Sequence, residues 1–119
     1  MKARNDGKDA EGRAARYLEE KGYRIVARNW RARRGELDLV AMHDGTLCFV
    51  EVRQRGGGAR VTALESIDRR KQASLVRAAQ EYLLRHGLHR QAARFDVIAI
   101  DARGELTHLE NAFTADVLR

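Results

Sequence analysis

The dipeptide Asp44-Gly45, placed between two apolar runs, constrains this chain more than any other feature of its sequence. Residues 37–42 and 47–52 are apolar and strand-like, and Asp-Gly between such runs is a strong signal for a two-residue β-hairpin turn. With that turn, the expected cross-strand pairs are 42–47, 40–49, 38–51 and 36–53. Asp38 should therefore face Glu51, whereas a loop of three or five residues would remove this pairing.

One face of the predicted hairpin changes from apolar near the turn to ionic at the open end. Asp38, Glu51, Glu36 and Arg53 all fall on that ionic end. Two carboxylates about 5 Å apart repel by roughly 3 kcal/mol at an effective dielectric near 20. A shared proton, the neighbouring Arg53 or a bound divalent cation could offset this repulsion; alternatively, both acids face solvent on a half-exposed ribbon. If a cation binds, oxygen ligands with room for water favour Mg²⁺ or Mn²⁺.

The apolar periodicity predicts two helices and five strands within one domain spanning residues 1–119. Glycines supply the punctuation, because the chain has no proline. The expected helices cover about 9–21, ended by Gly22, and 67–85, ended by Gly87. The expected strands cover 23–30, 37–42, 47–52, 95–100 and 105–109, with a basic glycine-containing loop over 54–65 and a terminal helical turn capped by Asn111. The order αβββαβ with a small tail indicates an α/β (α+β) fold, a mixed sheet flanked by helices.

The charge of the chain favours a phosphate-bearing partner. Lysine and arginine number 23 against 17 acids, and only four of the 23 are lysines. The planar guanidinium suits phosphate, although an ordinary solvated face or an arginine-rich composition without a partner would give the same count. With 6% aromatic residues, stacking of single strands is poorly supported, so duplex or branched DNA is favoured. The candidate nucleic-acid-binding residues flank the predicted acidic pair in sequence: Arg28, Arg31, Arg33, Arg34, Arg55 and Arg60.

Several classes of protein are excluded or disfavoured by what the sequence contains. Cys48 is the single cysteine, so an internal disulfide and a zinc site of several thiolates are excluded, and its strand parity points it into the core. No stretch approaches the roughly 20 apolar residues that cross a bilayer, so we expect no membrane association and a cytoplasmic location. Asp96, on the strand at 95–100, is expected either to pair with an arginine or to support the acidic pair from behind.

Four separated blocks of the sequence resemble a known family. Residues 35–40 (GELDLV), 49–53 (FVEVR), 94–98 (RFDVI) and 111–113 (NAF) resemble the YraN-like family of bacterial proteins, over a span from about Lys8 to Phe113. That family is similar to archaeal Holliday-junction resolvases in the PD-(D/E)XK nuclease superfamily. The resemblance implies a restriction-endonuclease-like core, a homodimer, and a Mg²⁺-dependent, structure-selective DNA endonuclease.

The resemblance also implies roles for individual residues. Asp38 and Glu51 would be metal-binding carboxylates, with the backbone carbonyl of Val52 as a further ligand. Glu11 matches the acid that the first helix contributes in resolvase-like members, and Glu36 lies beside the motif as an outer-shell group.

The chain departs from the superfamily pattern at Arg53, where lysine is usual. Arginine stays protonated and cannot be a general base, but it could orient a water molecule or stabilise charge on the phosphate. Lys71, on the second helix, could lend a positive charge to the site; the alternative is a surface lysine whose stem packs on apolar neighbours. We therefore expect a metal-dependent endodeoxyribonuclease, and keep open a non-catalytic nucleic-acid-binding module or a protein that uses its charge to bind another protein.

Overall fold

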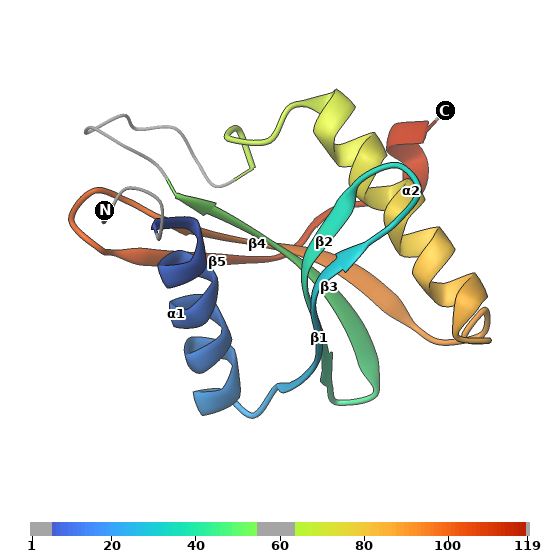
Figure 1. Ribbon diagram of the computed structural model, residues 1–119, viewed down its shortest axis with the longest axis horizontal. Coiled ribbons are helices and arrows are strands. Elements are labelled where there is room, and N and C mark those ends of the chain that lie inside the picture. The colour runs from blue at the N-terminus through green and yellow to red at the C-terminus, as the bar shows by residue number, and fades with distance from the viewer. Residues whose placement is uncertain (1–5, 55–63, 119) are drawn as a thin grey trace.

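The computed structural model describes residues 6–54 and 64–118, and within them a five-stranded sheet carries one long helix on each face (Figure 1). The strands lie in the order β1-β2-β3-β4-β5. Neighbouring strands run antiparallel except β3 and β4, which are parallel because a helix crosses over between them. The elements are α1 (Asp6–Glu20), β1 (Arg24–Arg31), β2 (Glu36–His43), β3 (Thr46–Gln54), α2 (Arg69–Arg85), β4 (Ala93–Ile100), β5 (Leu106–Phe113) and the 3-10 helix η2 (Ala115–Leu118).

Each long helix buries its apolar stripe against a different face of the sheet. On one face, Ala14 and Leu18 of α1 pack with Val50 of β3 and Ile98 of β4. Cys48 is fully buried on this face, as its parity predicts, and burial raises the pKa of its thiol to about 11, which disfavours the thiolate at neutral pH. This face is the smaller-residue side of the core.

On the other face, α2 packs its stripe on the apolar end of the hairpin. Leu75 and Tyr82 lie in one cluster with Val40 and Phe49. Asp68 caps the helix by accepting a hydrogen bond from the backbone N–H of Lys71 at 2.8 Å. The sheet is therefore covered on both sides, and neither described helix is long and apolar enough to cross a membrane.

The hairpin has the predicted turn and register. Met42 pairs with Leu47 and Val40 pairs with Phe49. The regular pairing ends one step before the acidic residues, because Leu39–Val50 is the last pair. Beyond that pair the alternation of β2 also breaks, since Leu37 joins the α2-side cluster although Leu39 faces α1. The predicted pairs 38–51 and 36–53 thus lie outside the ladder, at a bend in β2.

The prediction that Asn111 begins a terminal helical turn is wrong. Strand β5 continues through Asn111 to Phe113, and the 3-10 helix η2 starts only at Ala115. Asn111 has φ of 52°, opposite a register shift between Phe95 and Val97 of β4. Asparagine tolerates this left-handed conformation, so the polar residue marks a strand irregularity instead of a helix start.

Candidate active site

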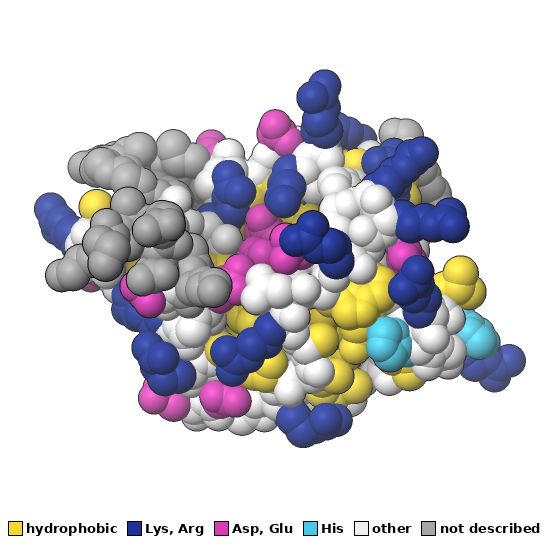
Figure 2. Space-filling model, in the orientation of Figure 1, with side chains coloured by type: hydrophobic (Ala, Val, Ile, Leu, Met, Phe, Trp, Pro, Cys, Tyr) yellow, Lys and Arg dark blue, Asp and Glu magenta, His cyan; other side chains and the backbone are white. Residues whose placement is uncertain are grey.

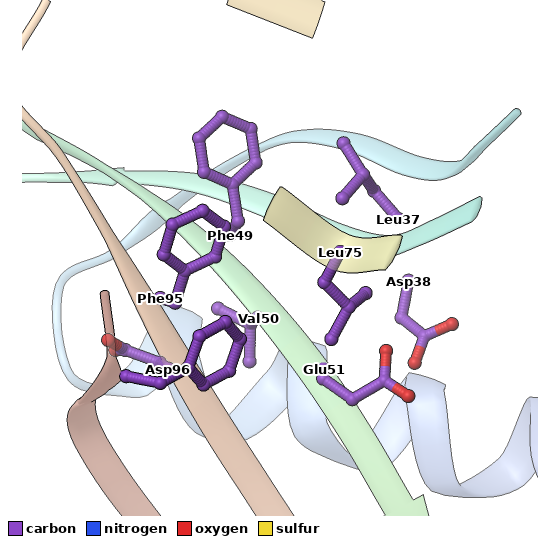
Figure 3. Close-up of a pocket in the computed structure, with 9 residues that line it drawn as sticks. Leu37, Asp38, Phe49, Val50, Glu51, Leu75, Phe95 and Asp96 are labelled. Carbon is purple, nitrogen blue, oxygen red and sulfur yellow. The ribbon is translucent and has the colours of Figure 1, made fainter. Parts of the chain in front are cut away.

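Asp38 and Glu51 come together where β2 bends away from β3. Figure 3 shows their carboxyl groups turned toward one another beside Leu75 of α2. Glu51 is 5% exposed, and Asp38 is half-buried and accepts a hydrogen bond from the backbone N–H of Val52 at 3.0 Å. Burial, and then the proximity of Asp38, raise the pKa of Glu51 to about 8. The sequence-based expectation that these two acids share one site is thus realised by the bend, without a regular cross-strand pair.

Two cationic side chains meet the buried carboxylate from different elements. Lys71 Nζ, from the first turn of α2, lies 3.6 Å from Glu51 Oε2, and Arg53 Nη1, from β3, lies 3.7 Å from the same oxygen. Arg53 also donates from Nη2 to the carbonyl oxygen of Ser66 at 3.0 Å, which fixes its direction. The other carboxylate oxygen, Glu51 Oε1, is buried and has no hydrogen-bond partner in the described part of the chain. Two cations therefore offset the negative charge at Oε2 of Glu51, whereas Oε1 has no hydrogen-bond partner among the described residues.

The first helix adds a further acid to this end of the sheet. The pKa of Glu11 is raised by partial burial, by Asp38 and by Glu36, while a hydrogen bond with the side chain of Asn29 and the charge of Arg28 act in the opposite sense. Glu11 thus lies within electrostatic reach of both Asp38 and Glu36. Asn29 is not among the residues that the sequence predicts; it has φ of 51° in the middle of β1, and an asparagine that interrupts a strand is the signal that could have found it.

The arrangement fits a single hard cation better than a closed cage. Among residues 6–54 and 64–118, no three His, Cys, Asp or Glu side chains stand together as a metal-binding group. However, a buried carboxylate with an unpartnered oxygen beside a second carboxylate is the donor set that Mg²⁺ or Mn²⁺ accepts, with water filling the remaining positions. The residues present therefore fit a cation held by Asp38 and Glu51.

The predicted arginines divide into three groups. Arg28 lies close enough to Glu11 to affect its pKa, while Arg31, Arg33 and Arg34 are exposed at the end of β1 and in the following turn. Arg55 and Arg60 lie outside the described residues. Figure 2 shows acidic side chains gathered near the centre of one face, with lysine and arginine side chains around them.

Asp96 belongs to a separate, buried network on the α1 side of the sheet. It is fully buried and contacts Arg94 Nε at 2.9 Å, His108 Nε2 at 2.9 Å and the backbone N–H of Asn111 at 3.0 Å. Of the two expected roles, pairing with an arginine is the correct one. Its oxygens are occupied by these partners, and it stands on the face of the sheet opposite to Glu51.

Comparison with known proteins gives a consistent family assignment. The model of the uncharacterised protein family UPF0102 matches residues 10–100. Three UPF0102 proteins illustrate the similarity: those of Persephonella marina (41% identical, covering 92% of this chain and 94% of the relative), Marinobacter nauticus (46%, covering 96% of each) and Ectopseudomonas mendocina (44%, covering 97% of this chain and 100% of the relative). The similarity extends over nearly the whole chain, and the likeness to YraN-like proteins is confirmed. This protein belongs to the UPF0102 family.

Proposed function

We propose that the protein is a metal-dependent, structure-selective DNA endonuclease that hydrolyses phosphodiester bonds in duplex or branched DNA. The observation that carries the proposal is the Asp38–Glu51 pair, with Glu51 Oε1 buried and unpartnered among the described residues. A buried carboxylate oxygen without a hydrogen-bond partner costs folding free energy, and such costs are typical of functional sites.

Each nearby side chain has a task in this reaction. A Mg²⁺ or Mn²⁺ ion bound by Asp38 and Glu51 would lower the pKa of a water molecule and polarise the phosphate. The backbone N–H of Val52 donates a hydrogen bond to Asp38 Oδ2, and this contact fixes the orientation of the Asp38 carboxylate. The carbonyl of Val52 remains the proposed further ligand. Glu11 and Glu36 would orient water from the outer side, which the electrostatic reach of Glu11 to both Asp38 and Glu36 supports.

The superfamily pattern has a lysine at the strand position that Arg53 occupies in this chain. We assign the role of that lysine to Lys71 of α2. The side chains of Arg53 and Lys71 are about equally exposed, but Arg53 is tied to the carbonyl of Ser66, whereas Lys71 reaches the same Glu51 oxygen from α2. A lysine that can move from Glu51 toward solvent can follow the charge that develops on a phosphate. Arg53 would then keep Glu51 oriented, and would act as a positioning residue.

Incubation of labelled linear and branched DNA with the protein and Mg²⁺ or Mn²⁺ tests the proposal. We expect cleavage by the natural protein, and loss of at least about a hundredfold in rate for Asp38→Asn and Glu51→Gln. Asp44→Asn is the matched control, since it removes a carboxylate from the exposed turn of the same hairpin. Cleavage that survives in both site variants would overturn the assignment of the site.

A second candidate is a nucleic-acid-binding module that keeps the nuclease fold without catalysis. Arg53 in place of lysine, and the neutralisation of Glu51 Oε2 by two side-chain cations, favour it. In that case DNA binding should persist at low salt with no cleavage in any divalent metal, and Arg53→Lys should restore some activity. If DNA is not retained even at low salt, the basic surface serves a protein partner instead.

A further inference from the structure

The outer face of α2 carries a row of arginines that starts beside the acidic pair. Arg70, Ser74, Arg77, Glu81 and Arg85 follow one another at intervals of three or four residues, so their side chains share one side of the helix. The three arginines are exposed, and the opposite side of the helix packs on the sheet. Lys71, next to Arg70, is the residue that reaches Glu51.

The turn between β1 and β2 lies against this row and adds to its positive charge. An added Cβ at Gly35 would stand 2.8 Å from Ser74 Oγ, which shows how closely the turn approaches the helix. The backbone N–H of Arg33 donates to Glu81 Oε1 at 3.0 Å. Arg33 and Arg85 together line an open hollow of about 400 Å³ at the far end of the row. The turn thus brings the exposed Arg33 and Arg34 alongside the helix.

The single acid in the row is already neutralised. Arg85 Nε lies 3.3 Å from Glu81 Oε2, and the other carboxylate oxygen is the one that accepts from Arg33. Because Arg85 offsets Glu81, the surface formed by five arginines (Arg33, Arg34, Arg70, Arg77 and Arg85) carries the excess positive charge of the other four; we call the five arginines the α2 basic track. Figure 2 shows lysine and arginine side chains over the region where Figure 1 places α2.

We propose that the α2 basic track is the surface along which the backbone of one double-stranded DNA arm lies, with the scissile phosphate at the Asp38–Glu51 end. This proposal rests on the proposed function. Fifteen residues separate Arg70 from Arg85, so the track rises about 22 Å, which matches about six base pairs of duplex. None of the five positions in the outer row of α2 is aromatic, so the row offers cations for phosphates and no surface for stacked bases.

Affinity measurements on two charge-matched variants test this. In the Asp38→Asn background, which removes cleavage, the double variant Arg77→Gln/Arg85→Gln is compared with Arg16→Gln/Arg103→Gln. The control pair removes two exposed arginines from α1 and from the β4–β5 turn, on the other side of the molecule. Fluorescence anisotropy of a labelled 20-base-pair duplex is measured between 50 and 200 mM salt, and thermal unfolding confirms that all variants fold.

We expect the track variant to bind the duplex on the order of tenfold more weakly for each arginine removed at 0.1 M salt, and its salt slope to fall by about 2. The control pair should keep nearly the full slope. Trp30 gives a local readout, because it is the only tryptophan and Arg85 lies 5.9 Å from its ring centroid. A change in Trp30 emission on binding that disappears in Arg85→Gln would support contact at this point.

The result that overturns the proposal is equal weakening by the two double variants, or unchanged binding by the track variant. Its failure can be separated from that of the proposed function. If the natural protein cleaves DNA, and Arg77→Gln/Arg85→Gln made without the Asp38→Asn change binds and cleaves normally, only the track is wrong. If the natural protein neither binds nor cleaves DNA, the proposed function itself fails, and the track with it.

Discussion

At the scale of single residues, Glu51 is held at a cost in stability. Its pKa of about 8 lies above the ordinary value of 4.5, so between these pH values the native state keeps a proton that the unfolded chain releases. The free energy of unfolding of the metal-free protein should therefore fall as the pH rises through this window. This is the direction expected of a buried acid whose ionised form is paired only in part.

Glu51→Gln should accordingly stabilise the metal-free protein at high pH. We expect a gain of about 1–3 kcal/mol at pH 8, shrinking toward zero near pH 5, because the amide cannot ionise. Urea unfolding in the presence of a chelator at the two pH values measures the effect. Asp44→Asn should leave stability within about 0.5 kcal/mol. A loss of stability in Glu51→Gln at pH 8 would contradict this account of the site.

The contribution of Asp96 to stability should depend on pH in the direction opposite to that of Glu51. Although burial alone would raise the pKa of Asp96, its hydrogen bonds with His108, Arg94 and the N–H of Asn111 lower it. Its contribution to stability is present above the ordinary pKa of 3.8 and is lost as the pH falls through the lower native value. Asp96→Asn should cost about 3–5 kcal/mol at pH 7 and less at pH 3, as measured by urea unfolding. The exposed Asp116→Asn serves as control, and a cost that does not shrink in acid would count against the ion pair.

At the scale of elements, the turn before β2 is held by a close contact with α2. Gly35 has φ of 112°, and a Cβ atom added to it would lie 2.8 Å from Ser74 Oγ, whereas Gly45 has φ of 80° with nothing within 4 Å of such a Cβ. Both positions disfavour a side chain through φ, but only Gly35 adds a collision. The turn that carries Arg33 and Arg34 can therefore pack this closely against α2 because Gly35 has no side chain.

Gly35→Ala should therefore destabilise the protein more than Gly45→Ala. We expect about 1 kcal/mol for Gly45→Ala and about 2–3 kcal/mol for Gly35→Ala, from thermal or urea unfolding. Combining Gly35→Ala with Ser74→Ala should recover the difference, since the removed hydroxyl is the atom in collision. Equal costs for the two glycine variants would mean that the turn does not press on α2.

Local signals in the sequence were sufficient for the helices and the hairpin, but not for contacts between distant segments. Asp44-Gly45 fixed the register of β2 and β3, and Gly22 marked the end of α1. In contrast, Asn111 lies in β5, where its backbone N–H donates a hydrogen bond to Asp96, a residue 15 positions away in the sequence. Arg77 and Arg85 are spread along α2, and only the packing of the β1–β2 turn makes them part of one surface. Asp38 reaches Glu51 through a bend that strict alternation does not predict.

At the scale of the whole molecule, three layers meet at the acidic pair. Glu11 comes from α1 on one face of the sheet, Lys71 from α2 on the other, and Asp38 and Glu51 from the sheet between them. A cation bound at this junction would stabilise the native state over the unfolded chain. The effect on stability can therefore be measured independently of any cleavage.

Adding Mn²⁺ should raise the Tm of the natural protein, and a chelator should reverse the rise. Ligand linkage gives about 2.7 kcal/mol at a free concentration of about one hundred times the Kd. The shift should vanish in Asp38→Asn and persist in Asp44→Asn, by thermal unfolding followed through circular dichroism. An equal shift in both variants would place the bound metal elsewhere.

The short connection between β2 and β3 also bears on the order in which the chain assembles. Asp38 and Glu51 are brought together by a hairpin that closes locally, on the microsecond scale, whereas Lys71 arrives only when α2 completes the long crossover to β4. A nascent chain therefore brings the two acids together with Arg53 as the nearby cation, before Lys71 is in place. Mildly acidic conditions, or a divalent ion in the surrounding solution, would reduce the remaining repulsion between the acids at that stage and speed refolding.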